Sequence, residues 1–193
     1  MEDIIEVIKS RRSIRAYKKE KIPRELVMKI LEAGRWAPSA SNNQPWRFVV
    51  IEDEEIIQQI AFESIAFGIN MFVRYATLII AIYSPVKHRW VDVDCGMCAQ
   101  NMMLEAHSLG IGSCFVGAFR EKAVKNTLGI PEKARIIGLI TFGFPAQVKE
   151  TKARLPLEEL VSFNKVSQNV KTPSLIQRTF LEISGRLFRR KSS

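Results

Sequence analysis

Two uncharged stretches with the composition of buried β-strands, separated by a long apolar helix, restrict the fold of this chain most. Thr77 to Tyr83 and Ile136 to Phe142 place branched residues on both faces, as in strands that are covered on both sides. Between them, the apolar residues from about Asp92 to Leu109 cover nearly the whole circumference of a helix. We therefore expect this helix in a core or in a subunit interface.

Shorter elements surround this centre. Small polar residues bracketed by prolines, from Ala37 to Pro45, predict a loop with many exposed amide groups. Phe48 to Ile51 has the pattern of a buried strand. Helical spacing and start or stop residues predict four further helices, over Ile4 to Ser10, Pro23 to about Gly34, Glu54 to Phe62, and Arg120 to Leu128.

Size and composition fit one soluble globular domain. The chain has 193 residues, of which 47% are hydrophobic and 25% charged. Its longest apolar run, Leu78 to Tyr83, is too short to cross a bilayer, and Met1 to Ser10 does not resemble a secretory signal. Three cysteines, an odd number, fit a reducing compartment. We therefore expect a cytoplasmic protein without a membrane partner.

Positive charge is concentrated at the C-terminal end. The net charge is +9, and the part from Lys171 onward holds six basic residues against the single acid Glu182. Such an arm could contact nucleic acid or an anionic surface. However, its apolar residues fall near helical spacing, which favours a helix packed on this subunit or on a partner over nucleic-acid binding. We expect a body over residues 1–165 and a helical basic arm over 166–193.

Three arginines and a serine lie within five residues after the first predicted helix, at Arg11, Arg12, Ser13 and Arg15. Guanidinium groups present planar forks of donors that match phosphate oxygens, so this cluster suits a phosphorylated ligand. A solvated basic helix end is the alternative. The cluster alone leaves both interpretations open.

Other motifs add little reactive chemistry. Gly110 to Gly117 resembles a dinucleotide-binding fingerprint, but it lacks the third glycine and follows a helix instead of a strand. We interpret it as a turn and strand whose backbone is closely approached by another group. An ordinary glycine-rich turn is the alternative. Cys95 and Cys98 lie in the apolar helix, where core packing is favoured over metal or redox chemistry. Because no hydrolase, phosphate-loop or zinc-peptidase motif occurs, an enzymatic role would depend on a bound cofactor.

Taken together, four separated motifs resemble those of the FMN-dependent nitroreductase family. R-R-S-I-R-A-Y resembles its R-R-S-x-R-x-F element, and A-P-S-A-S-N-N-Q-P-W its A-P-S-G-x-N-x-Q-P-W loop. D-C-G-M-C-A-Q-N-M resembles its D-x-G-x-A-x-Q-N-M helix, and G-F-P-A-Q-V-K-E-T-K-A-R-L-P-L-E-E-L its closing G-Y-P-x-E-x-x-x-x-K-x-R-x-P-L-E-E-x. Cys95 and Cys98 depart from the small residues usual there.

The resemblance implies an α+β fold with three α/β/α layers, in an interlocked homodimer. Each of its two FMN molecules lies at the subunit interface and is contacted by both chains. It implies that Arg11, Lys152 and Arg154 hold the cofactor phosphate, that Ser13 binds the phosphate or the ribityl chain, and that Arg15 lies at the N1/O2 edge of the ring. Arg12 is counted among the cofactor-binding residues as well. Val116 and Gly117 would lie against the ring near N5, and Asn70 would fill a flavin-contacting asparagine position. From the other subunit, the implied contacts are Pro38, Ser39, Ala40, Asn42 and Gln44.

The implied activity is transfer of hydride from NAD(P)H to a small acceptor, such as a nitroaromatic or a quinone, by a ping-pong mechanism. No side chain is singled out as a catalytic acid or base, and no metal is implied. Flavin-fragmenting synthases and reductive dehalogenases share the same fold and remain alternatives. A flavin-binding sensor without turnover is a further alternative from another functional class.

Overall fold

The computed structural model describes residues 3–64, 70–147, 150 and 154–166, and it divides the chain into two units, Met1–Lys149 and Glu150–Ser193. In the first unit, four antiparallel strands form a sheet in the order β1-β2-β4-β3. The strands are β1 (Arg47–Ile51), β2 (Leu78–Ser84), β3 (Gly112–Val116) and β4 (Arg135–Gly143).

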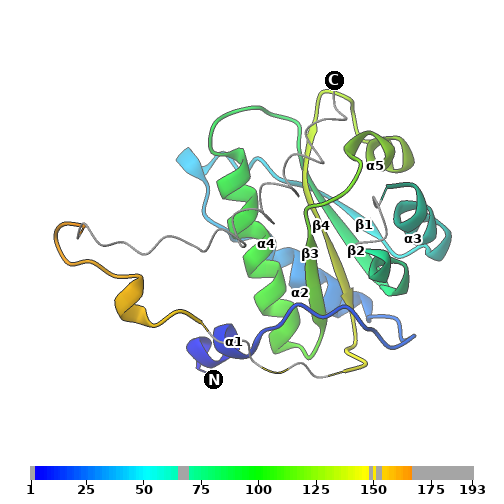
Figure 1. Ribbon diagram of the computed structural model, residues 1–193. Helices are drawn as coiled ribbons and strands as arrows, with labels where there is room; N and C mark the ends of the chain where they lie inside the picture. The colour runs from blue at the N-terminus through cyan, green and yellow to red at the C-terminus, as the bar shows by residue number, and fades with distance from the viewer. Residues whose placement is uncertain (1–2, 65–69, 148–149, 151–153, 167–193) are drawn as a thin grey trace, which may run out of the picture. The chain divides into compact units, whose positions relative to one another are not determined.

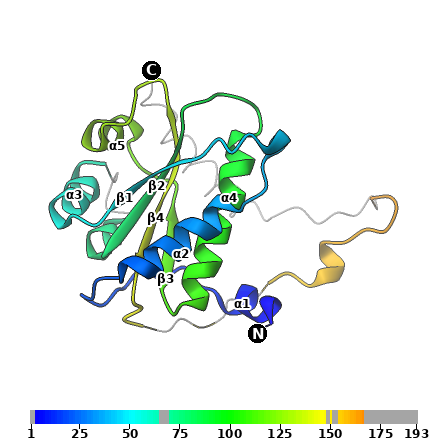
Figure 2. The same ribbon diagram turned by 180° about the vertical axis from the view of Figure 1, so that it is seen from behind.

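Helices cover both faces of this sheet (Figures 1 and 2). On one face, α2 (Arg24–Arg35) and α4 (Val91–Ser108) enclose a core cluster that contains Leu78, Ile80 and Ile82. On the other face, α3 (Glu54–Gln59) and α5 (Glu121–Leu128) contribute to a core cluster that contains Ile79 and Ala81. Alternate residues of β2 therefore point to opposite cores, which explains its unbroken apolar sequence. The expected α+β fold is confirmed.

Most expected elements are present with small differences at their ends. α1 spans Ile4–Ser10, with Asp3 as its N-cap, while Pro23 is the N-cap of α2 and not its first residue. The helix expected over Glu54 to Phe62 ends as α3 at Gln59 and continues as a π-helical turn, η2 (Ile60–Ser64). Short 3-10 helices occur at η1 (Ala40–Asn42), η3 (Met71–Tyr75) and η4 (Leu157–Glu159).

The described residues do not cover the long helix α4 on all sides. Cys95, Cys98 and Met102 are fully buried, whereas Val93 on the other side is 52% exposed. An apolar side chain that is open to water in one copy of the chain is consistent with an interface between copies. The helix expected in the basic arm lies outside the described residues.

Candidate functional site

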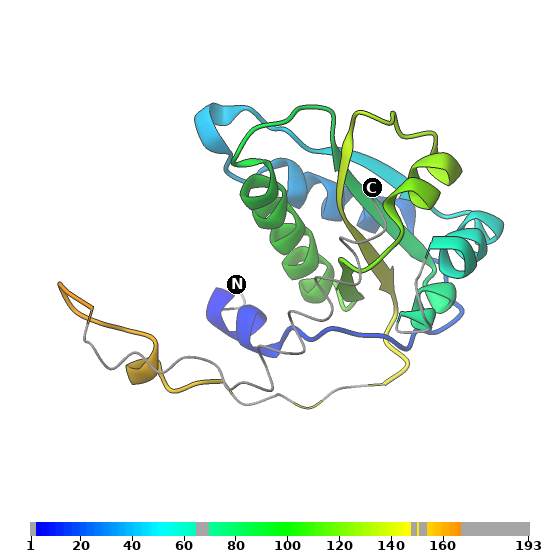
Figure 3. The same cartoon turned by 45° about the horizontal axis from the view of Figure 1, so that its top comes forward.

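The arginine-rich segment crosses the end of the sheet beside β3 (Figure 3). Ser13 forms a parallel bridge with Ser113, and the Ile14 N–H donates to the Ser113 carbonyl at 2.9 Å. Tyr17 is buried, and its hydroxyl contacts the Ile14 carbonyl and Thr141 Oγ1, each at 2.7 Å. Burial raises the pKa of Tyr17 well above its usual range. The segment is thus fixed by the sheet on which it lies.

Two glycines make room for this crossing. Gly112 and Gly143 are paired across β3 and β4. A Cβ atom on Gly112 would lie 2.8 Å from Ile14 Cβ, and one on Gly143 would lie 2.8 Å from Tyr17 Cδ1. Both approaches are closer than carbon atoms tolerate, so any larger residue here would push the arginine segment off the sheet.

The arginines of the cluster have different surroundings. The Arg12 guanidinium turns back to the end of α1 and donates to the carbonyls of Lys9 at 2.5 Å and Arg11 at 2.6 Å. Arg15 instead lies over the Phe72 ring, 5.4 Å from its centroid. Phe72 belongs to η3, and sequence analysis did not single it out.

Asn70 joins the same region. It precedes η3, and its Nδ2 donates to the Ala118 carbonyl at 3.4 Å. Ala118 directly follows Val116 and Gly117 at the end of β3. The structure therefore brings Asn70 to the end of β3, which the resemblance assigns to the flavin ring. Arg15 contacts η3, the short helix that Asn70 precedes. Gly117 is exposed there, and a Cβ on it would contact only Phe115, at 3.6 Å.

The loop from Pro38 to Gln44 is held by its own polar groups. The Gln44 N–H donates to Ser39 Oγ at 3.0 Å, and Gln44 Nε2 donates to Asn42 Oδ1 at 3.2 Å. Ser41, Asn42 and Gln44 have positive φ angles of 51°, 55° and 46°. Such angles are uncommon outside glycine and indicate a backbone that its surroundings hold in place.

A buried carboxylate anchors this loop to α4. Asp94 is only 2% exposed, and its Oδ1 accepts a hydrogen bond from the Ala40 N–H at 3.2 Å. Its other oxygen, Oδ2, has no hydrogen-bond partner among the described residues. Sequence analysis did not predict this role, although Asp94 opens the D-x-G motif and marks the position.

The two parts of the candidate site lie at opposite ends of α4 (Figure 1). Ala40 is bonded to Asp94 near the start of the helix, whereas Ser10 Oγ lies 2.8 Å from His107 Nε2 at its end. With a rise of roughly 1.5 Å per residue, the helix separates these contacts by about 20 Å. One copy of the chain therefore does not bring the Pro38 to Gln44 loop to the arginine segment.

Two predicted phosphate-binding residues belong to the second unit. Lys152 lies outside the described residues. Arg154 is described and exposed. Their convergence with Arg11 therefore stays a prediction.

The cysteines are buried free thiols, as the core-packing interpretation requires. Cys95 and Cys98 are completely buried, and burial raises the pKa of each thiol to about 12. Cys114 is 1% exposed on β3. Within the described ranges, no group of His, Cys, Asp and Glu side chains could hold a metal ion. No helix in the same ranges has the length and apolar character needed to cross a membrane.

Comparison with known proteins finds a matching family and several relatives. The profile of the Nitroreductase family matches residues 8–68 and 61–144. A protein from Archaeoglobus fulgidus named "Putative NADH dehydrogenase/NAD(P)H nitroreductase" is 36% identical, over 78% of this chain and 90% of the relative. The NADPH-flavin oxidoreductase of Vibrio harveyi is 30% identical, over 87% of this chain and 76% of the relative.

A solved structure is also similar. A "putative nitroreductase in complex with fmn" from Desulfovibrio desulfuricans superposes with a TM-score of 0.70 and 32% identity. The similarity covers 86% of this chain and 99% of that chain.

Proposed function

Since this chain belongs to the nitroreductase family, we propose that it is an FMN-dependent oxidoreductase that transfers hydride from NADH or NADPH to a nitroaromatic or quinone by a ping-pong mechanism. The FMN complex of the Desulfovibrio relative and the flavin oxidoreductase activity in the name of the Vibrio relative support the cofactor. When bound, FMN supplies the ring atom N5 that accepts and returns hydride. The buried free thiols suit a cytoplasmic location.

The observation that carries this proposal is the grouping of Arg15, Asn70 and Gly117 around the end of β3. Arg15 lies on Phe72 of η3, and Asn70 on the carbonyl next to Gly117. Because Gly117 is exposed and has no side chain, its backbone offers an open surface to a flat ring. These residues fit a flavin ring.

Each group has a defined task in the proposed site. With FMN bound, the Val116 and Gly117 backbone would lie against the ring, and one of its N–H groups would be available to N5. Arg15 places positive charge at the N1/O2 edge, where it favours the form of the ring that carries negative charge. Arg11, Lys152 and Arg154 hold the phosphate, whose nearly two negative charges require several cations. Ser13 binds the phosphate or the ribityl chain. Arg12 supports this cluster from the end of α1, where its guanidinium donates to the Lys9 and Arg11 carbonyls. Asn70 fills the flavin-contacting asparagine position.

We propose further that the site is completed by a second copy of the chain, which contributes Pro38, Ser39, Ala40, Asn42 and Gln44. The separation of about 20 Å along α4 supports this arrangement. So does the exposed Val93 on α4. The first helix, α1, has no buried residue, and its Ile4 is 72% exposed, which also favours burial against a partner.

The colour of the purified protein tests the cofactor. We expect a yellow protein whose absorbance is bleached by NADH or NADPH without oxygen and returns when a nitroaromatic or quinone is added. Repeated turnover distinguishes an enzyme from a sensor, which stalls after one reduction. A protein that stays colourless when titrated with FMN would refute the proposal.

A mixing experiment tests the shared site. Arg15→Ala removes the cation in one part, and Ala40→Trp places a bulky side chain in the other part. If each site uses Arg15 of one chain and Ala40 of the other, a heterodimer of the two variants retains one intact site. Random mixing then restores about a quarter of the wild-type sites. If both parts come from one chain, mixing restores none.

A further inference from the structure

A cavity of about 490 Å³ lies on the α3 side of the sheet, and no residue proposed to bind FMN lines it. Its walls include the buried residues Tyr17, Ile57 and Ala76. Phe62 and Tyr75 also line it, and they are 58% and 53% exposed. Two large aromatic side chains that remain open to water beside a cavity are a typical feature of a ligand site.

Positive charge predominates among the ionisable side chains of this cavity. Lys19, Lys21 and Arg74 line it, together with Glu52 and Glu54. Glu52 already accepts a hydrogen bond from Arg24, which does not line the cavity, at 3.1 Å. The cavity therefore favours an anion over a cation.

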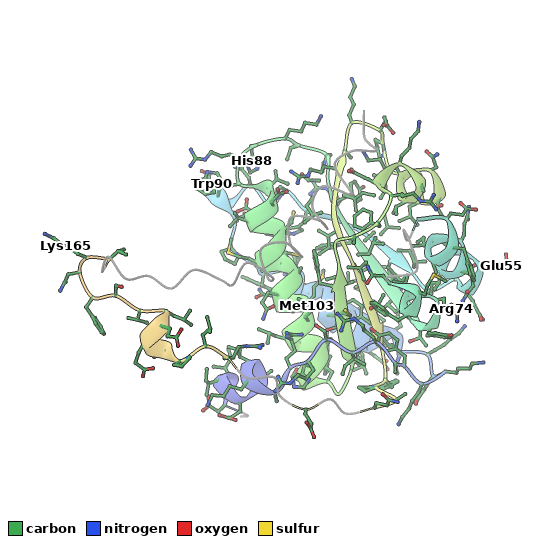
Figure 4. The ribbon with its side chains drawn as sticks, in the orientation of Figure 1. Glu55, Arg74, His88, Trp90, Met103 and Lys165 are labelled. Carbon is green, nitrogen blue, oxygen red and sulfur yellow. The ribbon has the colours of Figure 1, made fainter. Side chains whose placement is uncertain are left out.

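Arg74 is held in position by its neighbour. Its guanidinium lies over the Tyr75 ring, 4.6 Å from the centroid, and Nη2 also donates to the Tyr75 hydroxyl. Its Nε is buried and has no hydrogen-bond acceptor among the described residues. A buried donor without an acceptor costs free energy, which an anion in the cavity would recover if the guanidinium turned toward it. Figure 4 shows Arg74 on the side of the molecule that carries Glu55 of α3.

We propose that this cavity binds a small organic anion with a planar apolar body, of the aromatic carboxylate class. Its volume falls in the range of small-molecule sites. Phe62 and Tyr75 provide flat surfaces for the apolar body. The Arg74 guanidinium, whose planar donors match a carboxylate, binds the charged end, and Lys19 and Lys21 add positive charge at the rim.

Titration with 2-naphthoate and with its neutral analogue 2-naphthamide tests the charge requirement. We expect 2-naphthoate to bind at least tenfold more tightly, as measured by isothermal titration calorimetry. Equal affinities, or no binding of 2-naphthoate at millimolar concentration, would overturn the proposal. Binding is measured both with and without saturating FMN, so the result does not depend on the proposed oxidoreductase activity.

Variants test the position of the ligand. Arg74→Gln should weaken 2-naphthoate binding at least tenfold, and Lys19→Gln with Lys21→Gln several-fold. Lys18→Gln is the matched control, because it removes one charge from the same segment but Lys18 does not line the cavity. If Arg74→Gln fails to fold, the affinity of the double lysine variant for 2-naphthoate tests the position of the ligand. Unchanged affinity in the variants, or a change in flavin absorbance on 2-naphthoate addition, would place the ligand elsewhere and refute the site.

Discussion

The two parts of the candidate flavin site are built in opposite ways. The segment from Arg11 to Tyr17 is held by residues far away in the sequence, above all Ser113, Thr141 and the glycine pair of β3 and β4. The Pro38 to Gln44 loop is held mainly by bonds among its own residues and by one buried carboxylate. The first part thus depends on the packing of the whole sheet, and the second on local geometry.

The largest expected effect concerns the packing of the first part. Gly112→Val would force a side chain against Ile14, so we expect a loss of about 3 kcal/mol or more in the free energy of unfolding, measured with urea. Lys18→Val is the control, because Lys18 is an exposed residue next to the same segment. It should change the free energy of unfolding by no more than about 0.5 kcal/mol. Equal effects of the two substitutions would contradict the role of Gly112.

A smaller effect is expected when the second part loses its anchor. Asp94→Ala leaves the Ala40 N–H without its acceptor, which should lower the free energy of unfolding by about 1–3 kcal/mol. The freed loop should also weaken FMN binding, by about tenfold if 1.4 kcal/mol of loop ordering is lost.

Asp92→Asn is the matched control for Asp94. It removes one charge from the same helix, but Asp92 is exposed and pairs with Arg135 at 2.9 Å. Exposed ion pairs contribute less than about 1 kcal/mol, and FMN binding should not change. Similar loss of FMN affinity in both variants would show that the charge near α4 matters and the Ala40 contact does not.

Sequence patterns predicted the second part better than the first. The prolines and small polar residues of the loop lie in one continuous stretch, so its exposed turns were visible directly. The contacts of Tyr17 with Thr141, and of Arg15 with Phe72, join distant segments that no local pattern connects. The central strands were predicted because their apolar residues occupy both faces. For α4, the sequence predicted a core or a subunit interface without deciding between them, because the apolar spacing of a helix is the same in both.

The pH dependence of stability sharpens the comparison for Tyr17. Its pKa in the folded protein is raised above the unfolded value of 10.0. The contribution of Tyr17 to the free energy of unfolding is therefore fully present below pH 10. It falls as the pH rises further, because the unfolded chain loses the proton first. The loss should be about 1.4 kcal/mol per pH unit from this group. Tyr17→Phe should remove that part of the decline, while costing about 1 kcal/mol at neutral pH. If the free energy of unfolding depended on pH in the same way in the wild type and in Tyr17→Phe, the role of Tyr17 in this decline would be contradicted.

The smallest effect is expected at Arg12. Its guanidinium donates to carbonyls at the end of α1, so Arg12→Ala should cost about 0.3–1 kcal/mol of stability. We expect the affinity for FMN to fall much less than in Arg15→Ala, which removes the residue placed over Phe72. Titration of the two apoproteins with FMN measures the difference. Equal losses would assign Arg12 a direct share in phosphate binding.

The length of α4 has a consequence for how the chain tolerates change. One added residue within the helix would rotate Asp94 relative to His107 by about 100° and lengthen the spacer by about 1.5 Å. The anchor of the loop and the contact to Ser10 would then no longer face their neighbours together. In relatives that keep both contacts, we therefore expect surface loops to vary in length, whereas the number of residues in α4 between the two contacts stays the same.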